Sequence, residues 1–137
     1  MKLCSACLLG IKCRYNGGSS ENKKIIELSR KETFIPVCPE ELGGLTTPRE
    51  PSEIINGKVL SASGKDVTEN FIKGAMKTLK IAQLNDIKEA IFKQKSPSCG
   101  LGLIYDGSFT GKLIHGNGIT AELLIRNGIK VISECNL

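Results

Sequence analysis

Aromatic side chains are scarce in this sequence, and tryptophan is absent. Phenylalanine and tyrosine together make up 4% of the 137 residues. Proteins that hold single-stranded nucleic acids usually stack the bases on aromatic platforms, so this composition argues against a stable nucleic-acid complex. Basic residues exceed acidic ones by five, but they are scattered and form no run of five or more. Such a distribution is typical of a solvated surface, with at most a mild attraction for anionic substrates or RNA.

Long apolar runs are also missing. No run approaches the roughly 20 residues that a bilayer-spanning helix needs, and the N-terminus lacks the apolar region of a secretory signal. We therefore expect a cytoplasmic protein that does not enter a membrane. The length fits one domain over residues 1–137 with a core of its own, as a monomer or a homodimer.

Histidine occurs once, whereas cysteine occurs six times. A lone histidine such as His115, between Ile114 and Gly116, is more often structural than catalytic. Cytosolic thiols are kept reduced, so six cysteines are unlikely to form a disulfide framework. Metal ligands, catalytic thiols and small buried apolar residues are the alternatives.

Short apolar segments alternate with helical ones along the chain. The pattern predicts strands at 1–7, 33–37, 87–93 and 129–133, and helices at 21–31, 67–85 and 120–126. Ser20, Asp66 and Thr120 are the expected caps, with Glu69 completing a capping box behind Asp66. This alternation predicts an α/β fold, a three-layer α/β/α arrangement with a mostly parallel, Rossmann-like sheet.

The connecting segments differ in character. Residues 38–51 contain three prolines and two glycines, which predicts a long loop. Asn56-Gly57 predicts a hairpin over 54–62, and a second short hairpin is expected between 102 and 114. The helix at 67–85 should bury one apolar face and expose its lysines. That apolar face comprises Phe71, Ile72, Ala75, Met76, Leu79 and Ala82.

Three cysteines lie within a few residues of a predicted strand end, namely Cys7, Cys38 and Cys99. In a parallel sheet the loops that follow strands gather at the carboxyl edge, where ligands bind. Three converging thiols would form a metal or cluster site. Zinc with three protein ligands keeps an open position, and an iron–sulfur cluster normally takes four thiolates. The alternative is that all three are buried core residues.

The other cysteines fit the site less well. Cys4 and Cys7 form a CxxC pattern, but alternate side chains of a strand point to opposite faces, so we expect Cys4 to be buried in the sheet. A redox role for this pair is a further alternative. Cys13 is a candidate fourth ligand, and Cys135 is expected to be structural or exposed.

Several polar residues are near the three cysteines in sequence. Glu40, or less favourably Glu41, is a candidate general acid or base. Ser96 and Ser98 either donate hydrogen bonds to a substrate or shape the turn beside Cys99. Three further residues are candidates for ligand binding, namely Arg14, Tyr15 and Arg49. They either clamp an anionic or planar ligand or have only a surface role.

Taken together, several motifs resemble a family of small bacterial and archaeal proteins long labelled a domain of unknown function, to which thiouracil desulfidases belong. The motifs are Cys7-Leu8-Leu9-Gly10 with Cys13-Arg14-Tyr15-Asn16-Gly17, Pro36-Val37-Cys38-Pro39-Glu40 with Gly43-Gly44-Leu45 and Pro48-Arg49, Ser96-Pro97-Ser98-Cys99-Gly100, and Ile104-Tyr105-Asp106-Gly107. They extend over nearly the whole chain. Asn16 stands where the family usually has aspartate, and Cys4 where it usually has an aliphatic residue.

The resemblance implies a [4Fe–4S] cluster held by Cys7, Cys38 and Cys99, with the fourth iron free to take the sulfur of a thiolated base. The implied function is removal of sulfur from thiouracil-like bases, in which Glu40 assists a water and Ser96 and Ser98 orient the base. The implied partner is thus a small thiolated nucleobase. The alternative is a non-catalytic metal- or cluster-binding module linked to RNA thiolation.

Overall fold

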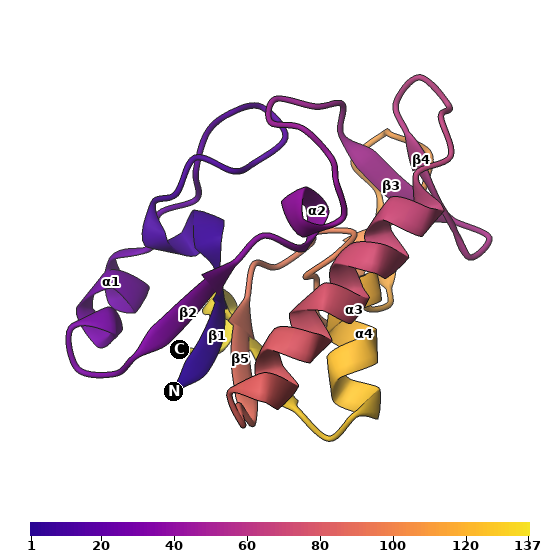
Figure 1. Cartoon of the computed structure of the whole chain (residues 1–137). Coiled ribbons are helices and arrows are strands. Elements are labelled where there is room, and N and C mark those ends of the chain that lie inside the picture. Colours follow the sequence, from indigo (N-terminus) through magenta and orange to yellow (C-terminus); the bar gives the residue numbers. More distant parts are fainter.

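A four-stranded parallel sheet forms the centre of the molecule (Figure 1). The computed structural model describes all 137 residues. The strands are β1 (Lys2–Ser5), β2 (Phe34–Val37), β5 (Glu89–Phe92) and β8 (Lys130–Ser133), in the order β2-β1-β5-β8. All three pairings are parallel, as the sequence predicts. A short 3₁₀ turn, η2 (Glu134–Asn136), ends the chain.

Helices cover both faces of this sheet. Helices α3 (Thr68–Leu84) and α4 (Ile119–Arg126) pack together over one face. Helix α1 (Lys23–Ser29) and the 3₁₀ turn η1 (Ala6–Leu9) lie on the other. Alternate residues of β1 enter the two cores, since Leu3 packs under α3 and α4 whereas Cys4 packs with Ile25 of α1. The expected α/β/α arrangement is confirmed. None of the helices is long and apolar enough to cross a membrane.

Two antiparallel hairpins are inserted between the sheet strands. The first pairs β3 (Ser52–Ile55) with β4 (Lys58–Ser61). Its turn residues, Asn56 and Gly57, both have positive φ, as a two-residue hairpin turn requires. The second pairs β6 (Leu103–Tyr105) with β7 (Leu113–His115). Both hairpins occur where the sequence predicts them.

The helix caps differ from the predictions. Helix α1 is capped by Asn22 rather than Ser20, and its side chain accepts hydrogen bonds from the backbone N–H groups of residues 24 and 25. Asp66 accepts two bonds from Thr68, but no capping box forms with Glu69. Helix α4 is capped by a glycine, because the hydroxyl of Thr120 is engaged elsewhere. A short polar side chain in the sequence therefore locates the first residue of a helix only to within a few positions.

The predicted loop at 38–51 contains a short helix, α2 (Pro39–Leu42). This helix packs on α3 and explains why the buried face of α3 is rotated from the prediction. Gly74 and Thr78 are buried, whereas Ile72 and Met76 are exposed. A β-carbon on Gly74 would lie 1.8 Å from the carbonyl oxygen of Pro39, so only glycine permits this contact.

Candidate active site

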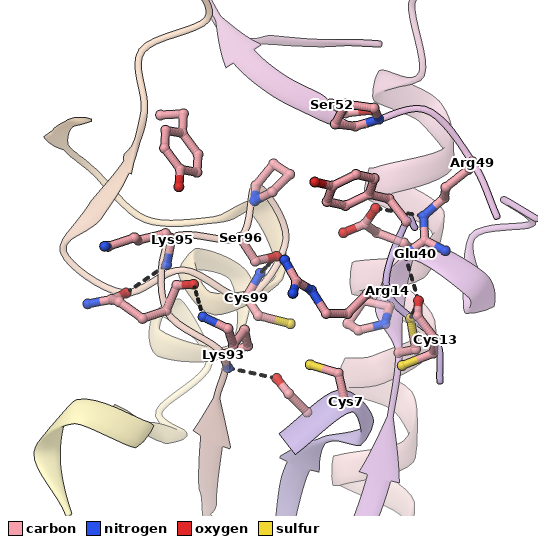
Figure 2. A pocket seen from close by; sticks show the side chains of 18 of the residues that line it. Cys7, Cys13, Arg14, Glu40, Arg49, Ser52, Lys93, Lys95, Ser96 and Cys99 are labelled. Carbon is pink, nitrogen blue, oxygen red and sulfur yellow. Dashed lines mark hydrogen bonds and ion pairs between the residues drawn. The ribbon is translucent and has the colours of Figure 1, made fainter. Parts of the chain in front are cut away.

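The order of the sheet strands creates a crevice at the carboxyl edge. The chain moves outward from β1 to β2, then returns across β1 to β5 and continues to β8. The switch point therefore lies between β1 and β5, which is where open α/β sheets bind their ligands. A cavity of about 460 Å³ opens at this place, and Ser52 of the first hairpin lies across it from Cys7 (Figure 2).

Four cysteines line this cavity, namely Cys7, Cys13, Cys38 and Cys99. The structure thus brings together the three thiols that the strand-end pattern singled out, and adds Cys13. The thiols of Cys7, Cys13 and Cys99 surround the base of the cavity (Figure 2). Cys7, Cys13 and Cys99 are buried, and Cys38 is half-buried.

The other two cysteines lie away from the cavity. Cys4 is fully buried within the sheet, as predicted, and its thiol contacts only the carbonyl oxygen of Ser5 among hydrogen-bond acceptors. Burial raises the pKa of Cys4 to about 12. Cys135 is exposed in the C-terminal turn. The expectation that Cys4 and Cys7 face opposite sides of one strand is wrong, because β1 ends at Ser5 and Cys7 lies in the 3₁₀ turn, where it packs in the same core cluster as Cys4. Of the two, only Cys7 lines the cavity.

Cys38 is positioned by α2. It is the N-cap residue of that helix, and its thiol donates a hydrogen bond of 3.8 Å to the carbonyl of Cys13. Helix α2 in turn rests on α3 through two glycines, Gly43 and Gly74, each of which meets backbone of the opposite helix. Asn70 of α3 donates a hydrogen bond of 2.9 Å to the carbonyl of Gly43. The thiol is therefore held by helix-to-helix contact and not by a free loop.

Cys99 is positioned by the start of α4. The backbone N–H groups of Ile119 and Thr120 donate to the carbonyls of Pro97 and Ser98, each at 2.9 Å. A β-carbon on Gly118 would lie 2.4 Å from the Ser98 carbonyl, so the loop and the helix start are in direct backbone contact. The loop thus satisfies the first N–H groups of α4, which have no partner inside the helix.

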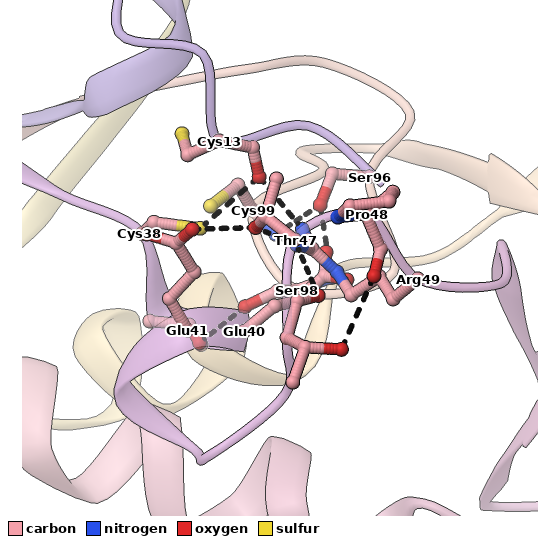
Figure 3. Close-up of polar contacts among 12 residues, drawn as sticks. Cys13, Cys38, Glu40, Glu41, Thr47, Pro48, Arg49, Ser96, Ser98 and Cys99 are labelled. Atoms are coloured by element: carbon pink, nitrogen blue, oxygen red, sulfur yellow. Dashed lines mark hydrogen bonds and ion pairs between the residues drawn. The ribbon is translucent and has the colours of Figure 1, made fainter. Parts of the chain in front are cut away.

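Ser96 and Ser98 shape this loop. The Ser96 hydroxyl accepts hydrogen bonds from the backbone N–H groups of Ser98 and Cys99, at 3.1 and 3.0 Å, and also lines the cavity. Ser98 is 1% exposed, pairs with Thr120 at 2.7 Å, and is not among the lining residues. These contacts favour the turn-shaping interpretation for both serines. Figure 3 shows the two serines beside Cys99.

Burial and mutual proximity raise the pKa of three thiols of the site, those of Cys13, Cys38 and Cys99. Burial raises the pKa of Cys99 to about 12. The Cys13 thiol and burial raise the pKa of Cys38. At Cys13 itself, a hydrogen bond with Cys38 lowers the pKa, but one with Cys7 and burial outweigh it, and the pKa rises to about 11. Thiols in such a setting become thiolates only when a positive group neutralises them.

Glu40 lies at the cavity wall in an ion pair with Arg49. The Arg49 Nε donates to Glu40 Oε1 at 3.0 Å, and both side chains are largely buried (Figure 3). Burial raises the pKa of Glu40, against the opposing effect of Arg49. Glu41, the other candidate, does not line the cavity and accepts a bond from the Thr47 hydroxyl instead. The structure therefore favours Glu40 over Glu41 for a role in the cavity.

Arg49 has a structural role that the sequence did not indicate. Its Nη2 donates to the carbonyl of Cys13 at 2.9 Å, and its Nη1 to the Thr47 hydroxyl at 2.8 Å. The backbone N–H of Arg49 donates to the carbonyl of Tyr15. One side chain thus connects the loop of Cys13, helix α2 and the segment after it. The clamp expected from Arg49 acts on the protein itself.

The upper walls carry planar and cationic side chains. Arg14 and Tyr15 line the cavity as expected, with the guanidinium carbon 5.7 Å from the tyrosine ring centroid. Sequence reasoning missed several other lining residues. These are Lys93, Gln94, Lys95, Tyr105 and Phe109. Lys93 to Lys95 directly follow β5, so the strand-end rule that selected Cys99 would also have found them. His115 is exposed and does not line the cavity.

No three histidine, cysteine, aspartate or glutamate side chains are arranged to hold a single metal ion. The four thiols of the cavity are soft donors, which suit zinc or iron–sulfur clusters better than calcium or magnesium. A cubane cluster is wider than one ion, because each thiolate binds a different iron. The donor set therefore fits an iron–sulfur cluster, whose usual ligands are thiolates.

Comparisons with known proteins identify the family of this chain. A family model described as 2-thiouracil desulfurase matches residues 3–136. The uncharacterised protein YbbK of Bacillus subtilis (strain 168) is 48% identical over 147 residues, which cover 100% of this chain and 97% of YbbK. The solved structure of the [4Fe–4S]-dependent thiouracil desulfidase TudS superposes with a TM-score of 0.94 at 42% identity, and the match covers 99% of this chain and 91% of TudS. The family resemblance seen in the sequence motifs is confirmed, and the chain belongs to the 2-thiouracil desulfurase family.

Proposed function

We propose that this protein is a [4Fe–4S]-dependent desulfidase that removes sulfur from thiouracil-like bases, with Cys7, Cys38 and Cys99 as the cluster ligands. The observation that carries the proposal is the cavity at the switch point of the sheet, which these three thiols line. The match to TudS over almost the whole chain supports the same cofactor and reaction.

The donor set fits the cluster on chemical grounds. Three strand-end segments that are distant in sequence each contribute one buried or half-buried thiol, and a cluster normally takes thiolates as ligands. The raised pKa values of Cys38 and Cys99 mean that these two thiols lose their protons on metal binding. Cys13 lies close to Cys38, whose thiol points to the Cys13 carbonyl. We assign it to the surroundings of the cluster and not to the ligand set.

When bound, the cluster supplies a Lewis-acidic iron for the thiocarbonyl sulfur of the base. The protein's own groups prepare the attack of water on the ring carbon. Arg49 holds Glu40 Oε1, so Oε2 is the atom that takes the proton from the water. Burial favours this uptake because it raises the pKa of the carboxyl. The C–S bond is replaced by a C–O bond, sulfide leaves, and no electrons are exchanged with another reagent.

The serines support this reaction by shaping the loop of Cys99. The Ser96 hydroxyl lines the cavity, so it can also donate a hydrogen bond to the base while it accepts from the backbone. Ser98, paired with Thr120, fixes the loop to α4. In this proposal Ser96 orients the base, and Ser98 acts through the position of Cys99.

The test is anaerobic reconstitution with iron and sulfide, followed by incubation with 4-thiouracil. We expect a brown protein, loss of the thione absorbance of the substrate, and release of sulfide with formation of uracil. Substitution of Cys7, Cys38 or Cys99 by serine should abolish bound iron and turnover together. Cys135→Ser, an exposed cysteine outside the cavity, is the matched control and should retain both.

The outcomes separate the enzyme from a binding module. A reconstituted protein that holds four irons but leaves 4-thiouracil intact would support the non-catalytic alternative. Failure to form any cluster in the wild-type protein would disprove the proposal. Loss of the cluster in Cys13→Ser, with retention in Cys7→Ser, would show that the ligand set is wrong.

A further inference from the structure

Phe109 is an unusual residue for its position. It occupies the loop between β6 and β7, its backbone is in the left-handed region with φ of 57°, and 38% of its surface is exposed. Bulky residues rarely adopt this conformation, and strained residues of this kind cluster at functional sites. Phe109 also lines the cavity of the four cysteines. An exposed aromatic ring at the wall of a site is more naturally a ligand contact than part of a core.

The loop that carries Phe109 is fixed by a carboxylate from the other hairpin. Glu53 Oε1, on β3, accepts hydrogen bonds from the backbone N–H groups of Gly107 at 3.0 Å and Phe109 at 3.1 Å. A β-carbon on Gly107 would lie 2.7 Å from the Ile55 side chain, so the loop is in close contact with β3. Glu53 therefore holds the backbone conformation that Phe109 would not adopt by itself.

The rest of the loop is also ordered by its own side chains. Asp106 accepts hydrogen bonds from the backbone N–H and the hydroxyl of Ser108, and that hydroxyl also pairs with Thr110. The backbone N–H of Asp106 donates to the carbonyl of Lys112 at 3.0 Å. The loop is thus a preformed wall, which keeps the cost of ordering the site on binding low.

We propose that Phe109 stacks on the pyrimidine ring of the substrate and determines the preference for planar bases, and that Glu53 is the positioning residue for it. This inference rests on the proposed function for the identity of the ligand. The cavity also contains Tyr15 and Tyr105, so both tyrosines of the chain and one of its four phenylalanines face the same space. In a chain so poor in aromatic residues, this concentration at one cavity suits a flat aromatic ring.

The substitution Phe109→Trp gives a direct test, because it introduces the only tryptophan of the chain. Stacking of 4-thiouracil against this residue should quench its fluorescence, and the titration yields a dissociation constant without any turnover. The control variant is Ile114→Trp, at an exposed position on β7 outside the cavity. The fluorescence of this tryptophan should fall by no more than the inner-filter effect of the ligand.

A second series measures the contribution of the ring. For the reconstituted protein, we expect the dissociation constant of 4-thiouracil to rise about tenfold in Phe109→Ala, which corresponds to about 1.4 kcal/mol and falls in the range of base–aromatic stacking. Phe109→Leu, which is apolar but not planar, should bind nearly as weakly as the alanine variant. Phe109→Tyr, which retains the ring, should bind like the wild type. The loss should appear in KM with little change in kcat, because stacking holds the base before and during the reaction alike.

The positioning role of Glu53 has its own signature. Glu53→Ala should weaken binding as much as Phe109→Ala, and the double variant should be no weaker than either single one. Glu53→Gln, whose amide oxygen still accepts the two backbone bonds, should remain close to the wild type. Iron content should be unchanged in all of these variants, since neither residue touches a proposed ligand.

These results distinguish the inference from the proposed function. Unchanged 4-thiouracil binding in Phe109→Ala, or no detectable binding to the wild type, overturns the inference. Ring-dependent binding in a protein that releases no sulfide would leave the inference in place and overturn the proposed function.

Discussion

The ion pair between Arg49 and Glu40 allows a quantitative prediction. The two side chains are 8% and 16% exposed, and the guanidinium also holds the Cys13 carbonyl and the Thr47 hydroxyl. In Arg49→Met the hydrophobic stem is retained, but the Glu40 carboxylate is left unpaired in a mostly buried site. Removing one partner of a buried pair typically costs about 3–5 kcal/mol, and the residual exposure argues for about 3 kcal/mol here.

The assay is urea unfolding of the cluster-free protein, followed by far-ultraviolet circular dichroism. Arg49→Met should lower the free energy of unfolding by about 3 kcal/mol and the melting temperature by roughly 10 °C. Arg49→Lys should recover less than half of this loss, because an ammonium group cannot bond several segments at once. The double variant Glu40→Gln/Arg49→Met should be more stable than Arg49→Met, since no charge is then left unpaired.

The predicted role of the ion pair would be refuted if Arg49→Met lowered the free energy of unfolding by less than 1 kcal/mol while this free energy kept the same dependence on urea concentration. It would also be refuted if Glu40→Gln/Arg49→Met were less stable than both Arg49→Met and Arg49→Lys. Because Arg49 connects the Cys13 loop with helix α2, we also expect Arg49→Met to retain less iron after gel filtration than the wild type.

Three further predictions concern the surroundings of the site. Gly74→Ala would place a methyl group 1.8 Å from the Pro39 carbonyl, so α2 must shift at a cost of about 1–3 kcal/mol. Iron retention after reconstitution should therefore fall. The control is Lys73→Ala, on the exposed face of α3, and equal iron retention in the two variants would contradict the prediction. In the native protein Cys4 should resist iodoacetamide, because burial raises its pKa to about 12, and mass spectrometry should find it modified only after unfolding. Hydrogen bonds from Asn117, the larger effect, and from Arg126 lower the pKa of Glu122 in the folded protein. The ionised carboxylate therefore stabilises the fold fully at a pH above the pKa of the unfolded state, and this stabilisation is lost as the pH falls through the pKa of the folded state. Glu122→Gln should therefore flatten the pH dependence of the melting temperature below about pH 5 relative to the wild type.

The position of the three thiols follows from sequence because it depends on strand order and not on detail. A short apolar run that gives way to a segment with proline or glycine marks the end of a strand, and parallel strands end at one edge. Cys7, Cys38 and Cys99 each lie within a few residues of such a strand end, and all three line one cavity. The alternation rule does not separate Cys4 from Cys7, because β1 ends at Ser5 and both side chains pack in the same core cluster.

Features that arise from contacts between distant segments were not predictable in this way. The buried face of α3 depends on the packing of α2, which the proline-rich segment did not reveal as a helix. The role of Arg49 depends on four partners of its side chain, which are the carboxylate of Glu40, the carbonyls of Cys13 and Thr46, and the hydroxyl of Thr47. Phe109 lies in a glycine-rich loop, whose conformation is fixed by Glu53 of the other hairpin and by hydrogen bonds within the loop.

The proposed ligands differ in how the fold supports them. Cys7 belongs to the first turn after a central strand, and its carbonyl accepts a bond from Ser20. The supports of Cys38 and Cys99 are glycine contacts that permit close approach of backbones, at Gly74 and at Gly118. Such contacts have two consequences. They leave no room for side-chain adjustment, so the thiols are held in place before a cluster binds, and they make these glycines as sensitive to substitution as the ligands. Cluster assembly in this protein should therefore depend on helix packing behind the cavity as much as on the cysteines that face it.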